Sequence, residues 1–281
     1  MAKRLIVCAD DFGRDLAVNE AVEEAHRSGI LTCASLMVGA PAAADAIERA
    51  RRLPELRIGL HIVLIDGKPV LPNTSLARGG GNFDDNQMIA GLRYFFQPGI
   101  RRMLAGEIRA QFEAFRATGI ALDHVNSHKH MHLHPTVARL VVEIGREFGM
   151  RAMRLPDEPT AALNRAFPQE RRVAPPYRFA GIALRRRLRR QGIASNDHLF
   201  GIGWSGGMDE ARLLGLLPHL PDGISEVYSH PAVARTAELQ RAMPGYRNPA
   251  ELAALLSPDV RRRIDELGIR LIAYDDLTRA V

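Results

Sequence analysis

The sequence predicts an α/β fold in which one domain forms a (β/α) barrel. Short apolar runs alternate with segments of helical periodicity from residue 5 to residue 273, and this alternation is typical of a parallel sheet covered by helices. About seven strands can be counted, which suits a barrel better than an open sheet. The 281 residues fit one large domain, and neither an internal repeat nor a linker divides them.

The first half of the chain supplies most of the strand and helix signals. A continuous apolar run such as Leu5 to Ala9 is typical of a buried parallel strand. Pro41 and Pro135 stand where a proline commonly opens a helix, and Gly29 stands where a glycine commonly ends one. The expected strands cover 5–9, 31–38, 57–62, 121–126 and 151–155, the expected helices cover 16–28, 41–53, 100–118 and a segment from 135, and 66–87 is expected to be a loop.

The second half resumes the same alternation after an interruption. Residues 157–196 form an irregular, basic insertion with no clear period. Beyond it we expect strands near 198–202, 225–229 and 269–273, and helices near 208–217 and within 247–267.

Composition excludes several classes of protein. The chain is 46% hydrophobic and 25% charged, and its net charge is +6, yet it carries no motif of a nucleic-acid-binding domain, so we expect no nucleic-acid partner. No apolar run reaches the ~18 residues of a membrane span, and the first ten residues do not resemble a signal peptide. We expect a cytoplasmic protein in which Cys8 and Cys33 are reduced core thiols.

Polar side chains follow four of the expected strands at their ends. Asp10 and Asp11 end the first strand, His61 ends the third, a run of histidines follows 121–126, and His230 follows 225–229. Because strand ends meet at one face of a barrel, these side chains are expected to share a site. Two histidines and a carboxylate form a facial set for one divalent ion, and Zn²⁺ or Mg²⁺ are the expected ions. Asp11, His61 and one histidine of the run could hold it, with Asp10 as a base and His230 as a proton donor.

The histidine run leaves its own ligand undecided. Five of the ten histidines of the chain stand at even positions from 124 to 134. A continuous strand would place all five on one face, but a catalytic ion usually takes about three protein ligands. Either the strand ends within the run, or most of these histidines have other roles.

At these residues the chain resembles the YdjC-like carbohydrate deacetylases. The segments "ADDFG" (9–13), "GLH" (59–61), "DHVNSHKHMH" (123–132) and "SHP" (229–231) carry the resemblance. It implies a distorted (β/α) TIM-like barrel and a metal-dependent hydrolase that removes acetate from an N-acetylated amino sugar. It also implies roles for individual residues. These are Asp11, His61 and His128 as metal ligands, Asp10 as the base, His230 as the general acid, and His130 and His132 as pocket residues near the substrate.

Arg154 is a further candidate, near the end of the expected strand 151–155. It could contact the substrate or orient Asp10, and a structural ion pair is the alternative.

Two longer stretches resemble a narrower branch associated with hopanoid biosynthesis. They begin "TCASLMVGAPAAADAIERA" at residue 32 and "FRATGIALDHVNSHKHMHLHP" at residue 115. The branch implies that the substrate is an N-acetylglucosaminyl group on a bacteriohopanepolyol. Asn126 and Lys129 depart from the "DSHHHVH" of members that act on chitooligosaccharides, although the presumed ligands are kept.

Rival functions remain open: a deacetylase of N-acetylated oligosaccharides, another metal hydrolase such as a phosphoesterase, or a non-catalytic sugar- or lipid-binding protein. The stretch 177–192 could form a basic amphipathic helix that contacts an anionic membrane surface at the inner membrane face. The oligomeric state is not indicated by the sequence.

Overall fold

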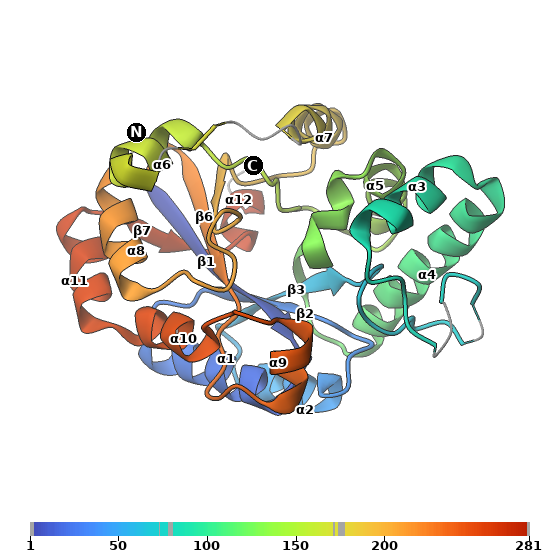
Figure 1. Ribbon diagram of the computed structural model, residues 1–281, viewed down its shortest axis with the longest axis horizontal. Coiled ribbons are helices and arrows are strands. Elements are labelled where there is room, and N and C mark those ends of the chain that lie inside the picture. Colours follow the sequence, from blue (N-terminus) through green and yellow to red (C-terminus); the bar gives the residue numbers. More distant parts are fainter. Residues whose placement is uncertain (1–2, 73, 78–80, 171, 174–177, 280–281) are drawn as a thin grey trace.

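A single curled parallel sheet forms the centre of the protein (Figure 1). The computed structural model describes residues 3–72, 74–77, 81–170, 172–173 and 178–279. Within them the strand order is β4-β3-β2-β1-β6-β5, and β7 pairs with β1 beside β2. The strands are β1 (Arg4–Phe12), β2 (Cys33–Leu36), β3 (Arg57–Ile62), β4 (Leu122–Ser127), β5 (His198–Phe200), β6 (Ile224–Ser229) and β7 (Arg270–Ile272).

Helices cover the outside of the sheet. Figure 1 shows α3, α4 and α5 gathered on one side, away from α8, α10 and α11. The α-helices are α1 (Leu16–Ser28), α2 (Ala43–Arg51), α3 (Gln87–Phe96), α4 (Pro98–Ala117), α5 (Pro135–Glu147), α6 (Thr160–Ala166), α7 (Arg178–Arg190), α8 (Glu210–Leu216), α9 (Ala237–Ala242), α10 (Asn248–Leu256), α11 (Pro258–Glu266) and α12 (Asp275–Thr278). Three 3₁₀ turns complete the chain, η1 (His128–Leu133), η2 (Pro168–Glu170) and η3 (Leu217–His219).

The sheet closes only loosely between β4 and β5, which makes the barrel a distorted one. Val125 of β4 forms an isolated parallel bridge with Met153, and Ala152 forms another with Ala194. The expected strand 151–155 is therefore reduced to single bridges. The predicted single-domain α/β fold with a distorted TIM-like barrel is confirmed.

The segment 157–196 and three helices differ from the sequence-based expectation. The segment 157–196, expected to be irregular, contains α6, η2 and α7, and α7 is the expected basic helix. Residue 171 and residues 174–177 of this segment lie outside the described residues, as do 73 and 78–80 of the expected loop. The helices α3, α9 and α12 were not expected, because they are short.

The interior of the barrel is unusually polar. Arg154, Glu226, Asp10 and His124 are all buried there, whereas the large apolar cluster lies mainly between the sheet and its helices. Buried charges are costly unless they are paired, so these side chains must satisfy one another. Among the described residues, no helix is long and apolar enough to cross a membrane.

Candidate metal-dependent active site

The end of β1 presents two adjacent carboxylates to the same region. Neighbouring residues of a regular strand point to opposite faces. Here the β1–β2 register shifts between Ala9 and Phe12, and Asp11 has a left-handed backbone with φ of 64°. This bulge turns both Asp10 and Asp11 toward one pocket, which they line together. Both carboxylates are buried.

Asp11, His61 and His128 form one compact group of donor atoms. Oδ1 of Asp11 lies 3.3 Å from Nε2 of His61 and 3.2 Å from Nδ1 of His128. Ligand atoms about 2.0–2.1 Å from a shared tetrahedral Zn²⁺ would lie roughly 3 Å apart. Among the described residues, no hydrogen bond satisfies Oδ1 of Asp11 or Nε2 of His61, although both are buried. The three side chains therefore fit a divalent cation, and the structure brings the expected ligands together.

Asn126 fixes the orientation of one of these histidines. Its amide nitrogen lies 3.2 Å from Oδ1 of Asp10, and this carboxylate can only accept a hydrogen bond at neutral pH. The same amide nitrogen also donates to Oγ of Ser35. The amide oxygen therefore accepts from Nδ1 of His61, at 2.7 Å. This hydrogen bond leaves the lone pair of Nε2 directed at Asp11, as a metal-binding histidine requires.

Asp10 is held from behind by Arg154. Two hydrogen bonds of 2.5 and 2.9 Å join the guanidinium to the two oxygens of Asp10, and Arg154 also donates to Glu226 at 2.7 and 2.9 Å. Burial alone would raise the pKa of Asp10, but the Arg154 charge outweighs it and keeps that pKa well below its usual range. Arg154 is fully buried and does not line the pocket, and it forms ion pairs with both Asp10 and Glu226.

His230 lies across the pocket and is positioned by α10. Its backbone N–H donates to Oε2 of Glu251 at 2.7 Å, and its carbonyl accepts from the amide of Asn248 at 2.7 Å. Nδ1 of the His230 ring has no hydrogen-bond partner among the described residues. Burial lowers the pKa of His230, although the charges of Asp11 and Asp10 act in the opposite direction. A protonated His230 would therefore be a readier proton donor than an ordinary histidine.

The histidines of the run have separate environments. Lys129 and His130 both have left-handed backbones, so the strand ends at Ser127 and its alternation does not continue. The ring of His130 lines the pocket, and its Nε2 lies 3.1 Å from the hydroxyl of Tyr228. His132 is fully buried, pairs with Oγ of Ser127 at 2.7 Å and does not line the pocket.

His124 is a core residue beneath the site. Its Nδ1 lies 2.8 Å from Oδ2 of Asp123, and its Nε2 lies 3.0 Å from Oγ of Ser35. Cys8 and Cys33 lie next to it as free, buried thiols.

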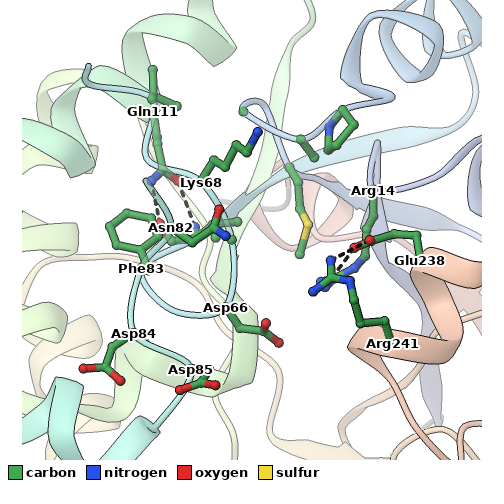
Figure 2. Close-up of a pocket in the computed structure, with 17 residues that line it drawn as sticks. Arg14, Asp66, Lys68, Asn82, Phe83, Asp84, Asp85, Gln111, Glu238 and Arg241 are labelled. Atoms are coloured by element: carbon green, nitrogen blue, oxygen red, sulfur yellow. Dashed lines mark hydrogen bonds and ion pairs between the residues drawn. The ribbon is translucent and has the colours of Figure 1, made fainter. Parts of the chain in front are cut away.

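Two cavities lie near the candidate ligands. The pocket that Asp10, Asp11, His61, His128 and His230 line has a volume of about 720 Å³. A second cavity of about 560 Å³ is lined by other residues, among them Arg14 and Asp66 (Figure 2).

Two ion pairs link the second cavity to the ligand group. Its Arg14 lies 3.4 Å from Oδ2 of Asp11, and its Asp66 lies 3.8 Å from Nε2 of His128 and 2.9 Å from Nζ of Lys129. Arg14 and Asp66 were not expected at the site, because no motif of the sequence singles out either residue.

Comparisons with known proteins find a family model and relatives that span nearly the whole chain. Residues 4–266 match the model of the family described as YdjC-like protein. A carbohydrate deacetylase of Geobacillus stearothermophilus is 30% identical over 276 residues, covering 98% of both chains. A carbohydrate deacetylase of Brevibacillus brevis is 28% identical over 278 residues, covering 98% of this chain and 99% of the relative.

Among solved structures, a candidate cellobiose-phosphate cleavage protein of Enterococcus faecalis V583 superposes with a TM-score of 0.79 at 25% identity. That superposition covers 99% of both chains. An uncharacterised protein of Agrobacterium tumefaciens C58 shares the fold with a TM-score of 0.50 at 12% identity, over 98% of this chain and 89% of that one. The match of the family model over nearly the whole chain identifies this protein as a member of the YdjC-like family.

Proposed function

We propose that this protein is a metal-dependent carbohydrate N-deacetylase, a hydrolase of a non-peptide C–N bond. The observation that carries the proposal is the juxtaposition of an unsatisfied Asp11–His61–His128 donor group with the separate carboxylate of Asp10 in one pocket. A base beside a divalent cation is the arrangement needed to activate water toward an amide. The names of the relatives in Geobacillus and Brevibacillus agree with it.

The residues of this chain would divide the reaction between them. A bound Zn²⁺ or Mg²⁺ would polarise the acetamide carbonyl and make a nearby water more acidic. Asp10, kept ionised by Arg154, accepts a proton as water attacks the carbonyl carbon. The C–N bond then breaks, and His230 supplies a proton to the departing amine, so acetate and a free amino sugar leave. His130, whose ring faces the pocket beside Tyr228, contacts the sugar.

The preferred substrate is an N-acetylglucosaminyl group on a bacteriohopanepolyol, and an N-acetylated oligosaccharide is the alternative. Lys129 supports the first choice, because this residue of the pocket forms an ion pair with Asp66 of the second cavity. This departure from the chitooligosaccharide-type pattern would change how a second sugar is received. A lipid-linked substrate also favours a cytoplasmic protein that acts at the inner membrane face.

Acetate release tests this proposal. The protein would be incubated with N-acetylglucosaminyl-bacteriohopanetetrol or N,N′-diacetylchitobiose and a panel of divalent metals, with Asp10→Asn as the control. We expect metal-dependent release from the hopanoid substrate by the wild type only. Release from the chitobiose alone would keep the chemistry and replace the substrate. No acetate release from either substrate, together with measurable binding of the substrates, would favour a non-catalytic sugar- or lipid-binding protein.

A further inference from the structure

The outer face of α3 is an exposed apolar surface. Five of the nine large apolar side chains that are exposed among the described residues belong to this ten-residue helix. We call them the α3 surface: Met88, Ile89, Leu92, Phe95 and Phe96. Phe96 and Met88 are 68% and 76% exposed. Contiguous exposed apolar groups of this kind usually mark an interaction site.

The inner face of α3 is firmly attached, so the exposure is not a result of poor folding. The side chain of Asn86 caps the helix by accepting from the backbone N–H groups of Met88 and Ile89. Ala90 and Tyr94 are buried, and the Tyr94 hydroxyl donates to the carbonyl of Leu64 at 2.6 Å. The helix also packs on α4 and α5.

Charge selects among the partners that could cover this surface. No aspartate or glutamate occurs from residue 86 to residue 106, whereas Arg93, Arg101 and Arg102 lie within that stretch. Arg102 is exposed, and the guanidinium of Arg101 lies 5.9 Å from the ring centre of Phe95. Arg93 is paired with Asp84 at 3.8 Å, so Arg101 and Arg102 supply the positive charge beside the apolar side chains. Apolar side chains flanked by such arginines complement an anionic lipid surface. A second copy of this chain is a less suitable partner, because its net charge of +6 would repel the arginines beside this surface.

The α3 surface lies at the edge of the catalytic pocket. Gln87 and Gly91 of the same helix line that pocket, and the amide of Gln87 donates to the carbonyl of Lys129 at 2.8 Å. The ring of His134, another pocket residue, lies 6.1 Å from the ring of Phe95. A membrane that contacted the α3 surface would therefore lie beside the opening through which a lipid-linked sugar must enter.

We propose that the α3 surface docks the protein on anionic lipid bilayers and brings the catalytic pocket to the headgroup layer. The helix α7, with its many arginines, is less suited, because its Leu184 and Leu188 are buried and Arg185 is paired with Asp157. Lipid binding itself does not depend on the proposed function. Only the effect on turnover rests on it.

Vesicle sedimentation tests the proposal with the full chain. Wild type and the triple variant Met88→Gln, Leu92→Gln, Phe96→Gln would be mixed with vesicles of phosphatidylcholine, with or without phosphatidylglycerol. Glutamine preserves helix propensity, and Phe179→Gln on α7 is the matched control, because Phe179 is 80% exposed. We expect wild type and the control to bind the anionic vesicles and to release as salt rises. The triple variant should bind them at least tenfold more weakly.

Activity and size measurements complete the test. The triple variant should release acetate from soluble N,N′-diacetylchitobiose as the wild type does, but at least tenfold more slowly from a vesicle-embedded N-acetylglucosaminyl lipid. Failure of wild type to bind vesicles overturns the docking proposal, whatever the enzyme assays give. A wild-type dimer that the triple variant converts to monomer also overturns it, because the α3 surface would then be covered by a second copy. If wild type binds vesicles but hydrolyses neither substrate, the docking proposal stands and the proposed function fails.

Discussion

Arg154, which is fully buried, donates hydrogen bonds to both carboxylate oxygens of Asp10. The same guanidinium also binds Glu226, so one cation neutralises two buried carboxylates. The planar guanidinium lies over the aromatic ring of Tyr228, and its central carbon is 4.8 Å from the ring centre. The proposed base is thus oriented by a residue that does not line the pocket.

Replacing this cation should alter the pH dependence of catalysis. In Arg154→Lys the compact ammonium cannot keep all four hydrogen bonds, so the pKa of Asp10 rises and its orientation loosens. We expect kcat/KM for acetate release to fall at least tenfold and the acid limb of its pH profile to move to higher pH. Arg151→Lys, at a residue 63% exposed, is the control. An unchanged acid limb would contradict the assigned role.

Removing the Asn126 amide should weaken metal binding without removing a ligand. Asn126→Ala deletes the acceptor for Nδ1 of His61, so the ring is free to rotate and to change tautomer. Loss of such a partner typically costs 10- to 100-fold in metal affinity. Competition with a chelator would measure it, with the exposed Asn82→Ala as control. Chelation should also lower the Tm of wild type, because the ion binds the folded chain. Equal affinity in wild type and Asn126→Ala would refute this role.

Glu251 should make stability depend on pH. Burial raises its pKa from 4.5 to about 7, against the opposing hydrogen bonds from the backbone N–H groups of Met208 and His230. The folded chain therefore holds this proton more tightly than the unfolded chain. The resulting stabilisation is complete below about pH 4.5 and is lost as the pH rises toward 7.

Urea unfolding of wild type and Glu251→Gln between pH 5 and pH 8 would measure this contribution. The variant lacks the titrating group, and its misplaced amide adds a cost that does not vary with pH. The advantage of wild type over the variant should shrink by up to about 3 kcal/mol over this range, at ~1.36 kcal/mol per pKa unit. A difference that stays constant with pH would argue against a protonated Glu251.

A methyl group at Gly59 should disturb the core below the metal site. A Cβ added there would lie 2.4 Å from Cε1 of His124, which is fixed by Asp123 and Ser35 and cannot move away. We expect Gly59→Ala to lower the free energy of unfolding by about 1–3 kcal/mol, as overpacking does. Gly99→Ala is the matched control, since nothing lies within 4 Å of its added Cβ. Chemical denaturation compares the two, and similar stabilities would be inconsistent with this contact.

The strand ends could be predicted from the sequence, and with them the residues of the site. Apolar runs such as Leu5 to Ala9 mark strands clearly, and the polar residue that ends each run must lie at the barrel face. Asp10, Asp11, His61 and His230 were located in this way. His128 needed the resemblance, because two left-handed residues end the alternation of the run and no local pattern announces them.

The supporting residues could not be predicted from local pattern. Asn126 and Glu226 stand in strands without a motif that marks them, and their partners are distant in sequence. Arg154 was expected near the site, but only the three-dimensional structure separates a residue behind Asp10 from one beside the substrate. His132 is buried and does not line the pocket, whereas His130 does.

The position of Arg154 also constrains how the chain can fold. It pairs with Asp10, 144 residues before it, and with Glu226, 72 residues after it. A chain that had assembled only its N-terminal or only its C-terminal strands would have to bury this cation without one of its counterions, at a cost of several kcal/mol. Partly assembled barrels are therefore disfavoured, and folding should be cooperative from end to end. The ion pairs that orient the proposed base are complete only when β6, which carries Glu226, has joined the sheet. A chain that has not finished folding would therefore lack the proposed active site.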